Sequence, residues 1–210
     1  MNSPNNISES GGYLRLTTRA EAAPFTCSDP LGNYSTQYTS GAITTYGKFS
    51  QTYGRFEIRA AFPAATAAGL QSSLWLDPNN GAKYGAWPAS GEIDVAEFYS
   101  QYPDRVIPYI HYLPATPDPN VTNTVCLITP SQFHSYVLQW TTNQLTVSFD
   151  GTSCLVDTWN PAAPLVAPQP FDQSFFVALT QALGVGSNVF GSTSTPLPAT
   201  TQIDYVRAWK

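Results

Sequence analysis

Short runs in which apolar and polar residues alternate recur along the chain, and Gly, Pro, Asn and Asp separate them. Alternation with a period of two gives a β-strand one apolar and one polar face, whereas a helix needs apolar residues three and four positions apart. The pattern predicts strands and no helix. The expected ranges are 13–19, 41–50, 54–62, 72–77, 92–99, 106–113, 133–141, 144–150, 153–159, 174–182 and 202–209.

Each predicted strand has one apolar face to bury, so we expect two antiparallel sheets packed face to face. The composition agrees with an all-β protein, because 18 Pro and 14 Gly accompany only 11% charged residues. Such a chain has little material for surface helices and much for strands joined by turns. None of the Pro- and Ala-rich loops resembles an interdomain linker, so the 210 residues are expected to form one domain over 1–210.

Charge limits the partners of the protein. The net charge is −5, with nine Lys and Arg in all, which argues against nucleic acid and disfavours an anionic polymer. A neutral ligand fits best, and no apolar run approaches the length of a membrane span. The first twelve residues, MNSPNNISESGG, lack the basic and apolar regions of a signal peptide, and we interpret them as a replaced leader of an exported protein.

The chain has three cysteines and two histidines. Cys126 and Cys154 flank a predicted hairpin, which makes them candidates for a disulfide, and the alternative is that they and Cys27 are buried free thiols. No group of Cys and His has the spacing of metal ligands, so we do not expect a zinc site.

The stretch SGEIDVAEFY (90–99) concentrates acidic residues in a predicted strand. Glu92 and Asp94 lie on one face of a regular strand, and Glu97, at an odd spacing from both, points to the other face. A β-bulge adds one residue to a strand, so a bulge at Val95-Ala96 would return Glu97 to the face of Glu92 and Asp94. The stretch therefore predicts a bulged strand with three carboxylates on one face.

The spacing of the two glutamates suits glycoside hydrolysis. Four effective steps place their Cα atoms about 13 Å apart. Side chains that lean toward each other leave about 5 Å between the two carboxyl groups, as expected of a retaining glycosidase. The alternative is a solvated acidic strand, but Ile93, Val95 and Phe98 indicate that the opposite face is covered.

GEIDVAEF resembles the E-x-D-x-x-E signature of glycoside hydrolase family 16, in its bulged, laminarinase-like branch. Upstream, YTSGAITTYGKFSQTYGRFEIRAAFP (38–63) is similar to two successive strands of that family. Downstream, FHSYVLQWTTNQLTVSFDG (133–151) resembles its hairpin, and DYVRAW (204–209) resembles its closing strand. The resemblance extends over about residues 11 to 210 and implies a β-jelly roll (concanavalin-like) sandwich of two curved antiparallel sheets, with a sugar polymer on the concave face.

The resemblance also implies roles for the acidic residues. Glu92 corresponds to the nucleophile and Glu97 to the general acid/base, and Asp94 assists them. The implied enzyme is a retaining endo-β-1,3-glucanase that acts on a neutral glucan such as laminarin and needs no cofactor for catalysis. The expected partner is a polysaccharide, without nucleic acid or membrane, and the expected state is a secreted monomer.

Four further residues match positions of the family that bind substrate, and three of them have a structural alternative. Trp87 matches a tryptophan that stacks on a sugar, or else lies in the core. Arg55 matches an arginine in Y-G-R-F-E, or else belongs to a surface ladder of ion pairs. His111 matches a histidine next to the catalytic strand, or else is a satisfied interior residue. Gln181 lies near an asparagine position of the family, from which it would bond a sugar hydroxyl.

The remaining expectations concern metal and core. Family members use a carboxylate near the last strand for a structural calcium, and Asp204 is the matching residue. The tryptophans at 75, 140 and 209 are expected in the core because their neighbours are apolar, and the tryptophan at 159 fits either place. His134 is expected to be structural.

The sequence leaves two alternatives to the glucanase open. One is hydrolysis of a galactan such as agar. The other is a non-catalytic glycan-binding sandwich, but such relatives have usually lost one or both catalytic glutamates, whereas this chain keeps all three acids.

Overall fold

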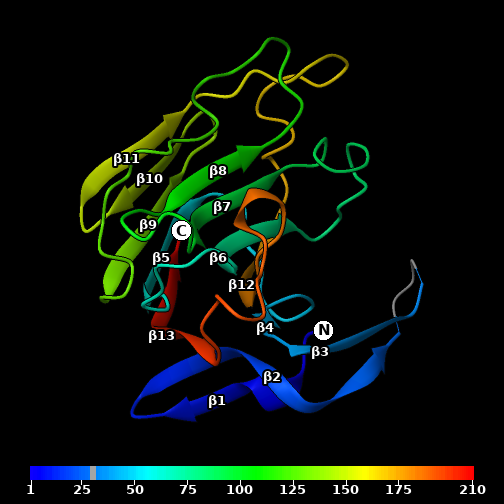
Figure 1. Cartoon of the computed structure of the whole chain (residues 1–210). Coiled ribbons are helices and arrows are strands. Elements are labelled where there is room, and N and C mark those ends of the chain that lie inside the picture. The colour runs from blue at the N-terminus through cyan, green and yellow to red at the C-terminus, as the bar shows by residue number, and fades with distance from the viewer. Residues whose placement is uncertain (29–31) are drawn as a thin grey trace.

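The computed structural model describes residues 1–28 and 32–210, and nearly all regular structure in them is β-strand (Figure 1). The strands are β1 (Ile7–Ser10), β2 (Tyr13–Cys27), β3 (Tyr34–Thr39), β4 (Gly41–Thr44), β5 (Gly54–Ala61), β6 (Leu70–Pro78), β7 (Glu92–Tyr99), β8 (Ile107–His111), β9 (His134–Trp140), β10 (Leu145–Phe149), β11 (Thr152–Asp157), β12 (Phe175–Leu183) and β13 (Ala199–Trp209). Two short 3₁₀ turns, η1 (Pro4–Asn6) and η2 (Gly186–Asn188), complete the described elements. No helix in the described part of the chain is long and apolar enough to cross a membrane.

The strands form two antiparallel sheets, as the alternation predicted. An eight-stranded sheet has the order β1-β2-β13-β5-β9-β10-β11, and β3 pairs with β2. A five-stranded sheet has the order β4-β12-β6-β7-β8. In Figure 1, β6, β7 and β8 of the five-stranded sheet lie side by side.

The core lies between the two sheets because each contributes its apolar face. Phe56 and Ile58 of β5 and Ile93 and Phe98 of β7 belong to one cluster and are at most 1% exposed. Each strand alternates, so the residues between these apolar positions point away from the core. On β7 those outward positions include the acidic residues.

The predicted strands differ from the observed ones mainly near the N-terminus. β1 and β3 were not predicted, and β2 continues well beyond the expected 13–19. The AEAAP segment at 20–24 lacks alternation, and pairing with β3 on either side of it extends the strand. Conversely, the strand expected over 41–50 ends at Thr44, because Thr45 accepts backbone hydrogen bonds from Lys48 and Phe49 and closes a turn.

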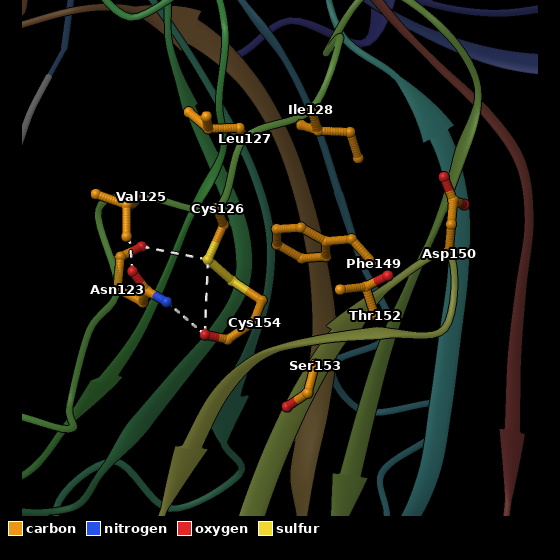
Figure 2. Close-up of a pocket in the computed structure, with 10 residues that line it drawn as sticks. All are labelled: Asn123, Val125, Cys126, Leu127, Ile128, Phe149, Asp150, Thr152, Ser153 and Cys154. Carbon is orange, nitrogen blue, oxygen red and sulfur yellow. Dashed lines mark hydrogen bonds between the residues drawn. A yellow bond between two sulfur atoms is a disulfide. The ribbon is translucent and has the colours of Figure 1, made fainter.

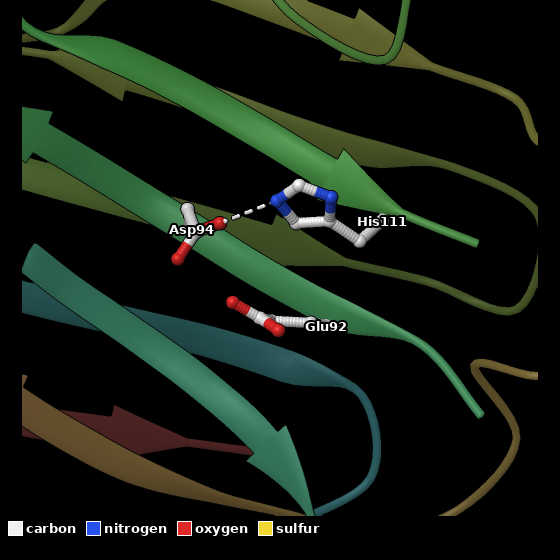
Figure 3. A group of neighbouring side chains, drawn as sticks. All are labelled: Glu92, Asp94 and His111. Atoms are coloured by element: carbon white, nitrogen blue, oxygen red, sulfur yellow. Dashed lines mark ion pairs between the residues drawn. The ribbon is translucent and has the colours of Figure 1, made fainter. Parts of the chain in front are cut away.

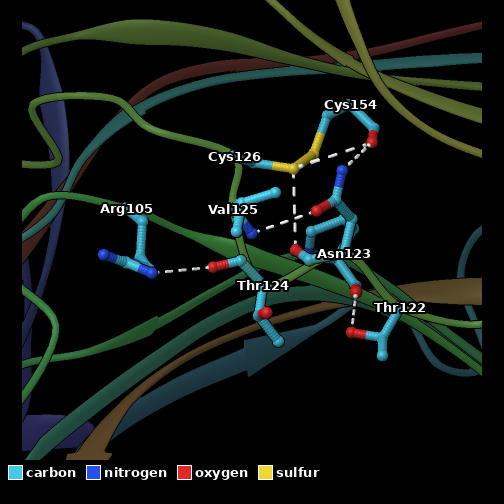
Figure 4. Close-up of a disulfide and its surroundings, with 8 residues drawn as sticks. Arg105, Thr122, Asn123, Thr124, Val125, Cys126 and Cys154 are labelled. Atoms are coloured by element: carbon cyan, nitrogen blue, oxygen red, sulfur yellow. Dashed lines mark hydrogen bonds between the residues drawn. A yellow bond between two sulfur atoms is a disulfide. The ribbon is translucent and has the colours of Figure 1, made fainter.

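A disulfide joins Cys126 and Cys154, with a Cα–Cα distance of 5.7 Å, so the predicted pair is confirmed (Figure 4). Next to it, the Asn123 side chain donates a hydrogen bond to the Cys154 carbonyl at 2.6 Å. The segment before Cys126 is thereby attached to β11. Figure 2 shows a pocket beside the disulfide that none of the predicted catalytic residues lines. Cys27 is a buried free thiol.

A second carboxyl pair lies at the end of β11, away from the predicted site. Asp157 is fully buried, and neither side-chain oxygen has a hydrogen-bond donor among the described residues. Its neighbour is the carboxyl group of Asp118, which accepts hydrogen bonds from the Tyr112 hydroxyl at 2.6 Å and the Asn120 amide at 2.9 Å. Burial, followed by the charge of Asp118, raises the pKa of Asp157 to about 7.

This pair predicts a specific dependence of stability on pH. Because the pKa of Asp157 is raised in the folded protein, the folded state holds a proton that the unfolded chain has lost, and stability falls as the pH rises from about 4 to about 7. We expect Asp157→Asn, whose amide donates to Asp118 at every pH, to stabilise the fold by about 1–3 kcal/mol at pH 8. Near pH 4 it should have little effect.

Urea unfolding of both proteins between pH 4 and pH 8 measures the difference. Asp104→Asn is a control, since Asp104 is exposed in an ion pair with Arg105. An equal pH dependence for wild type and Asp157→Asn would contradict the prediction.

Candidate active site

The acidic strand β7 contains the expected bulge. Asp94 pairs with Tyr109 of β8, and Glu97 pairs with Ile107. Two residues of β7 (95–96) therefore lie opposite one residue of β8, and the register against β6 shifts at the same point. The bulge predicted at Val95-Ala96 is confirmed.

The bulge brings the three carboxylates to one side of β7. Their common pocket is named here the carboxylate cleft and is lined by Asn2, Gln71, Ser73, Trp75, Glu92, Asp94, Glu97, Thr180 and Ala182. Val95 and Ala96 both pack into the core on the opposite side. Asp94 is only 3% exposed and Glu97 only 8%, which excludes a solvated acidic strand.

Glu92 receives a hydrogen bond from a tryptophan. The indole Nε1 of Trp87 donates to Oε2 of Glu92 at 2.6 Å. Trp87 is 63% exposed, so it lies at the cleft and not in the core. Its ring is thus held beside the carboxylate while remaining accessible to a ligand.

Asp94 contacts the imidazole of His111, which extends from β8 (Figure 3). Nε2 of His111 lies 3.0 Å from Oδ2 of Asp94, and the imidazole stacks on Tyr109 with centroids 4.1 Å apart. Burial lowers the pKa of His111 to about 4, so its imidazole is neutral at neutral pH. The structure therefore brings His111 to the acidic residues, as predicted from its strand.

Glu97 is held by three donors. Oε1 accepts from the Gln71 amide at 3.1 Å and from the Ser73 hydroxyl at 3.2 Å, and Oε2 accepts from the Tyr99 hydroxyl at 2.8 Å. These contacts leave the carboxyl group in one orientation, facing the cleft. None of the three donors was predicted, although Gln71 and Ser73 alternate on the strand that precedes the acidic one.

Burial shifts the acidic groups toward their protonated forms. It raises the pKa of Glu92 to about 7, against the opposing effect of the Trp87 hydrogen bond. It raises the pKa of Asp94 well above its ordinary range, with further contributions from the charges of Glu97 and Glu92. The pKa of Glu97 is raised by the same cause, against its hydrogen bonds to donors. The cluster therefore retains protons at a pH where exposed carboxylates are ionised.

A fourth carboxylate was missed in the sequence. Asp77 follows Ser73 and Trp75 at intervals of two on β6, so all three point to the cleft side of the sheet. Leu76 pairs with Ile93, and the next position along the ladder places Asp77 beside Glu92. The alternation in SSLWLDP could have indicated that Asp77 shares a face with Ser73 and Trp75.

The tryptophans fall into two classes. Trp140 and Trp159 are buried, at 1% and 3% exposure. The core position expected for Trp75 is wrong, because Trp75 lines the carboxylate cleft. Trp209 was expected in the core too, but it is 44% exposed and lies under the Arg55 guanidinium. At both positions, strand parity directs the ring away from the space between the sheets.

Arg55 is not brought to the carboxylates. It belongs to β5 of the eight-stranded sheet, and its neighbour Phe56 faces the core, so Arg55 points to the other side of the sandwich. Its guanidinium forms an ion pair with Glu57 at 2.6 Å. The substrate contact expected for Arg55 is corrected to the alternative, a surface ion pair on the far sheet.

Gln181 does not reach the cleft either. It is fully buried, and its Oε1 accepts hydrogen bonds from Ser72 at 2.6 Å and from Thr201 at 2.7 Å. Its neighbours Thr180 and Ala182 line the cleft, so Gln181 faces inward. Because Thr201 belongs to the opposite sheet, Gln181 links the sheets, and the expected contact with a sugar hydroxyl is corrected.

Asp204, the residue expected to bind a structural calcium, is paired with a cationic side chain. The Asp204 carboxylate forms an ion pair with Arg59 at 2.5 Å. The positive charge of the guanidinium offsets the negative charge of the carboxylate and would repel a second cation. His134 is structural, as expected, since Nδ1 contacts Asp150 at 2.6 Å and Nε2 contacts the Thr129 carbonyl at 2.9 Å.

Comparison with known proteins gives consistent matches. A family model described as glycosyl hydrolases family 16 matches residues 2–181. The glucan endo-1,3-beta-glucosidase A1 of Niallia circulans is 33% identical over 100% of this chain and 31% of its own length. The glucan endo-1,3-beta-glucosidase of Cryptopygus antarcticus is 30% identical over 84% of this chain and 68% of its own. This chain thus spans about a third of the length of the first of these relatives.

Among solved structures, the laminarinase catalytic domain of Thermotoga maritima is similar to this chain, with a TM-score of 0.80 and 27% identity. The match covers 100% of this chain and 82% of that domain. The expected jelly-roll fold is thereby confirmed.

Proposed function

Because the chain belongs to glycosyl hydrolases family 16, we propose that it is a retaining endo-β-1,3-glucanase that cleaves a neutral, laminarin-like glucan. The observation that carries this proposal is the bulge in β7, which gathers Glu92, Asp94 and Glu97 in one cleft. Two glutamates on one side of a strand provide a nucleophile and a proton donor for the same glycosidic bond.

In the first step, Glu92 attacks the anomeric carbon of the sugar. The bond from that carbon to the glycosidic oxygen breaks, and Glu97 transfers its proton to the departing oxygen. The product is a glycosyl group esterified to Glu92. The hydrogen bond from Trp87 orients Glu92 for this attack.

In the second step, Glu97 accepts a proton from water, whose oxygen attacks the anomeric carbon. The ester bond to Glu92 breaks and the carboxylate returns. Two displacements at the same carbon retain its configuration. The donors to both oxygens of Glu97 keep the carboxyl group in one place while it alternates between acid and base.

Asp94 lies between the two glutamates along β7 and is the most deeply buried of the three. Its Oδ2 lies 3.0 Å from Nε2 of His111, and burial, followed by the charges of Glu97 and Glu92, raises its pKa well above the ordinary range. We assign Asp94 the task of holding a proton so that Glu92 can ionise beside it. His111 fixes the orientation of Asp94.

The lining of the cleft favours a neutral polymer. Trp87 presents an exposed ring, which suits the apolar C–H face of a sugar. No Lys or Arg is among the residues that line the carboxylate cleft, whereas its carboxylates disfavour an anionic chain. This chemistry argues against a sulfated galactan and leaves a neutral one as the alternative substrate.

The place of action proposed is outside the cytoplasm. A disulfide is most stable in an oxidising compartment, and a polysaccharide of high molecular mass is met outside the cell. We further expect a monomer that needs no metal for its chemistry.

Incubation with laminarin, lichenan and agarose, followed by ¹H NMR of the first products, tests the proposal. We expect short oligosaccharides from laminarin, with a β-configured reducing end at the earliest times and mutarotation later. Release from agarose alone would favour the galactan alternative, and a first product of α configuration would refute retention.

A further inference from the structure

Among the described residues, Asp77 is the one carboxylate beside the two glutamates of the cleft without an assigned task. It lies on β6 across from Glu92, and Phe176 of β12 pairs with it on its other side. Asp77 is neither fully buried nor exposed, and it lies beside the carboxylate cleft, on the same face of β6 as the cleft residues Ser73 and Trp75. Four neighbouring strands of the sheet thus place four residues in one row, in the order His111, Glu92, Asp77 and Phe176.

Asp77 differs from the three carboxylates of the cleft in that its side chain has no hydrogen-bond donor in the described part of the chain. Glu92 has the indole of Trp87, Asp94 has His111, and Glu97 has three donors. Within residues 1–28 and 32–210, Asp77 has no such donor and no ion pair. A partly buried carboxylate without a donor is costly in the free protein and gains when a ligand supplies one.

The surroundings of Asp77 indicate which ligand supplies that donor. On the β12 side, the exposed ring of Tyr46 packs against the ring of Phe176, with ring centroids 5.1 Å apart. A carboxylate that accepts hydrogen bonds next to an aromatic surface is the combination that binds a sugar, through hydroxyl groups and an apolar face respectively.

We propose that Asp77 is a specificity-determining residue, which accepts hydrogen bonds from the hydroxyl groups of a neutral sugar lying across β6 and β12 and excludes sulfated or carboxylated sugars from that position. This inference rests on the proposed function and names the substrate class at one subsite. The exclusion is electrostatic: Asp77 adds a negative charge beside a cleft that already holds three acidic groups and has no Lys or Arg in its lining, so an anionic substituent at this position meets repulsion.

The same charge acts on the nucleophile. The negative charge of Asp77 contributes to raising the pKa of Glu92, after burial. Removal of that charge should lower the pKa of Glu92, so that the nucleophile ionises at lower pH. A residue that only filled space would leave this property unchanged.

The test compares wild type, Asp77→Asn and the control Asp104→Asn, on laminarin and on partially sulfated laminarin. Asparagine keeps the shape of the side chain and removes its charge. For Asp77→Asn we expect kcat/KM on neutral laminarin to fall by about tenfold, because the hydrogen bond to a charged carboxylate becomes a weaker one to a neutral amide oxygen. The ratio of kcat/KM on the sulfated polymer to that on the neutral one should rise by about tenfold or more, and the acid limb of the pH profile should move to lower pH.

A binding measurement separates this inference from the hydrolase itself. In the background of Glu92→Gln, calorimetry with a laminarin hexasaccharide should show weaker binding when Asp77→Asn is added. If wild type cleaves laminarin but Asp77→Asn changes neither the substrate ratio nor this affinity, the role of Asp77 is refuted and the enzyme stands. If wild type cleaves no β-glucan, the proposed function fails, and loss of hexasaccharide affinity on Asp77→Asn still supports the subsite whereas equal affinity overturns it.

Discussion

Replacement of Glu92 by Ala is expected to lower kcat on laminarin by on the order of 10⁵-fold, because no other group in the cleft can form the covalent intermediate. The neighbouring carboxylates cannot substitute for it. Asp94 is buried against His111, and Glu97 is held by its donors on the other side of the bulge. Reducing-sugar release measures the loss, and the isosteric Glu92→Gln should show one of similar size.

Azide distinguishes a lost nucleophile from a disturbed cleft. In Glu92→Ala, azide fits the space that the glutamate side chain occupied and attacks the anomeric carbon of a β-glucosyl fluoride, from which fluoride departs. One displacement inverts the anomeric centre, so the expected product is the α-glycosyl azide. A β-glycosyl azide from Glu92→Ala would contradict the assignment of Glu92, and an unchanged urea midpoint would show that the fold is intact.

Replacement of Glu97 by Ala should lower kcat on laminarin by roughly 10³-fold, the usual contribution of a general acid. The loss depends on the leaving group. A dinitrophenyl β-glucoside needs no proton to depart, so its first step should be nearly unaffected, and the glycosyl-enzyme should accumulate as a burst. Stopped-flow detection of dinitrophenolate measures it.

Azide also tests the acid/base role of Glu97, and here the expected product has the opposite anomeric configuration. In Glu97→Ala it attacks the glycosyl group on Glu92 and completes a second displacement, so the product should be the β-glycosyl azide. Tyr99→Phe is a matched control, since it removes one of three donors to Glu97 and keeps the carboxyl group. Equal losses of kcat on the activated substrate and on laminarin for Glu97→Ala would argue against an acid/base role.

The carboxylate cleft could be anticipated from local pattern to a large extent. An odd spacing between acidic residues in an alternating strand requires an extra residue if they share a face, and the bulge at 95–96 supplies it. The covered face could also be read from Ile93 and Phe98, because burial of one face of a strand follows from its alternation.

Other parts of the cleft depend on which strands become neighbours. Trp75, which lines the cleft, and Asp77, which lies beside it, are both on β6. The alternation of β6 gives two faces without saying which one meets the carboxylates. Pairing between β6 and β7 decides this. Apolar neighbours made Trp75 look like a core residue, although its parity on the strand was that of Ser73.

The alternation of residues was enough to place most of the strands, and the odd spacing of the acidic residues was enough to place the bulge in β7, whereas Cys126 and Cys154 were only candidates for a disulfide until the structure joined them. The tertiary structure decided where each face points. Arg55 matched a family position, yet it lies on the outside of the other sheet, and Gln181 faces inward to bond Thr201. The reason is physical: alternation is a property of one strand, whereas the sheet it joins and the surface it covers depend on contacts between residues far apart in the chain.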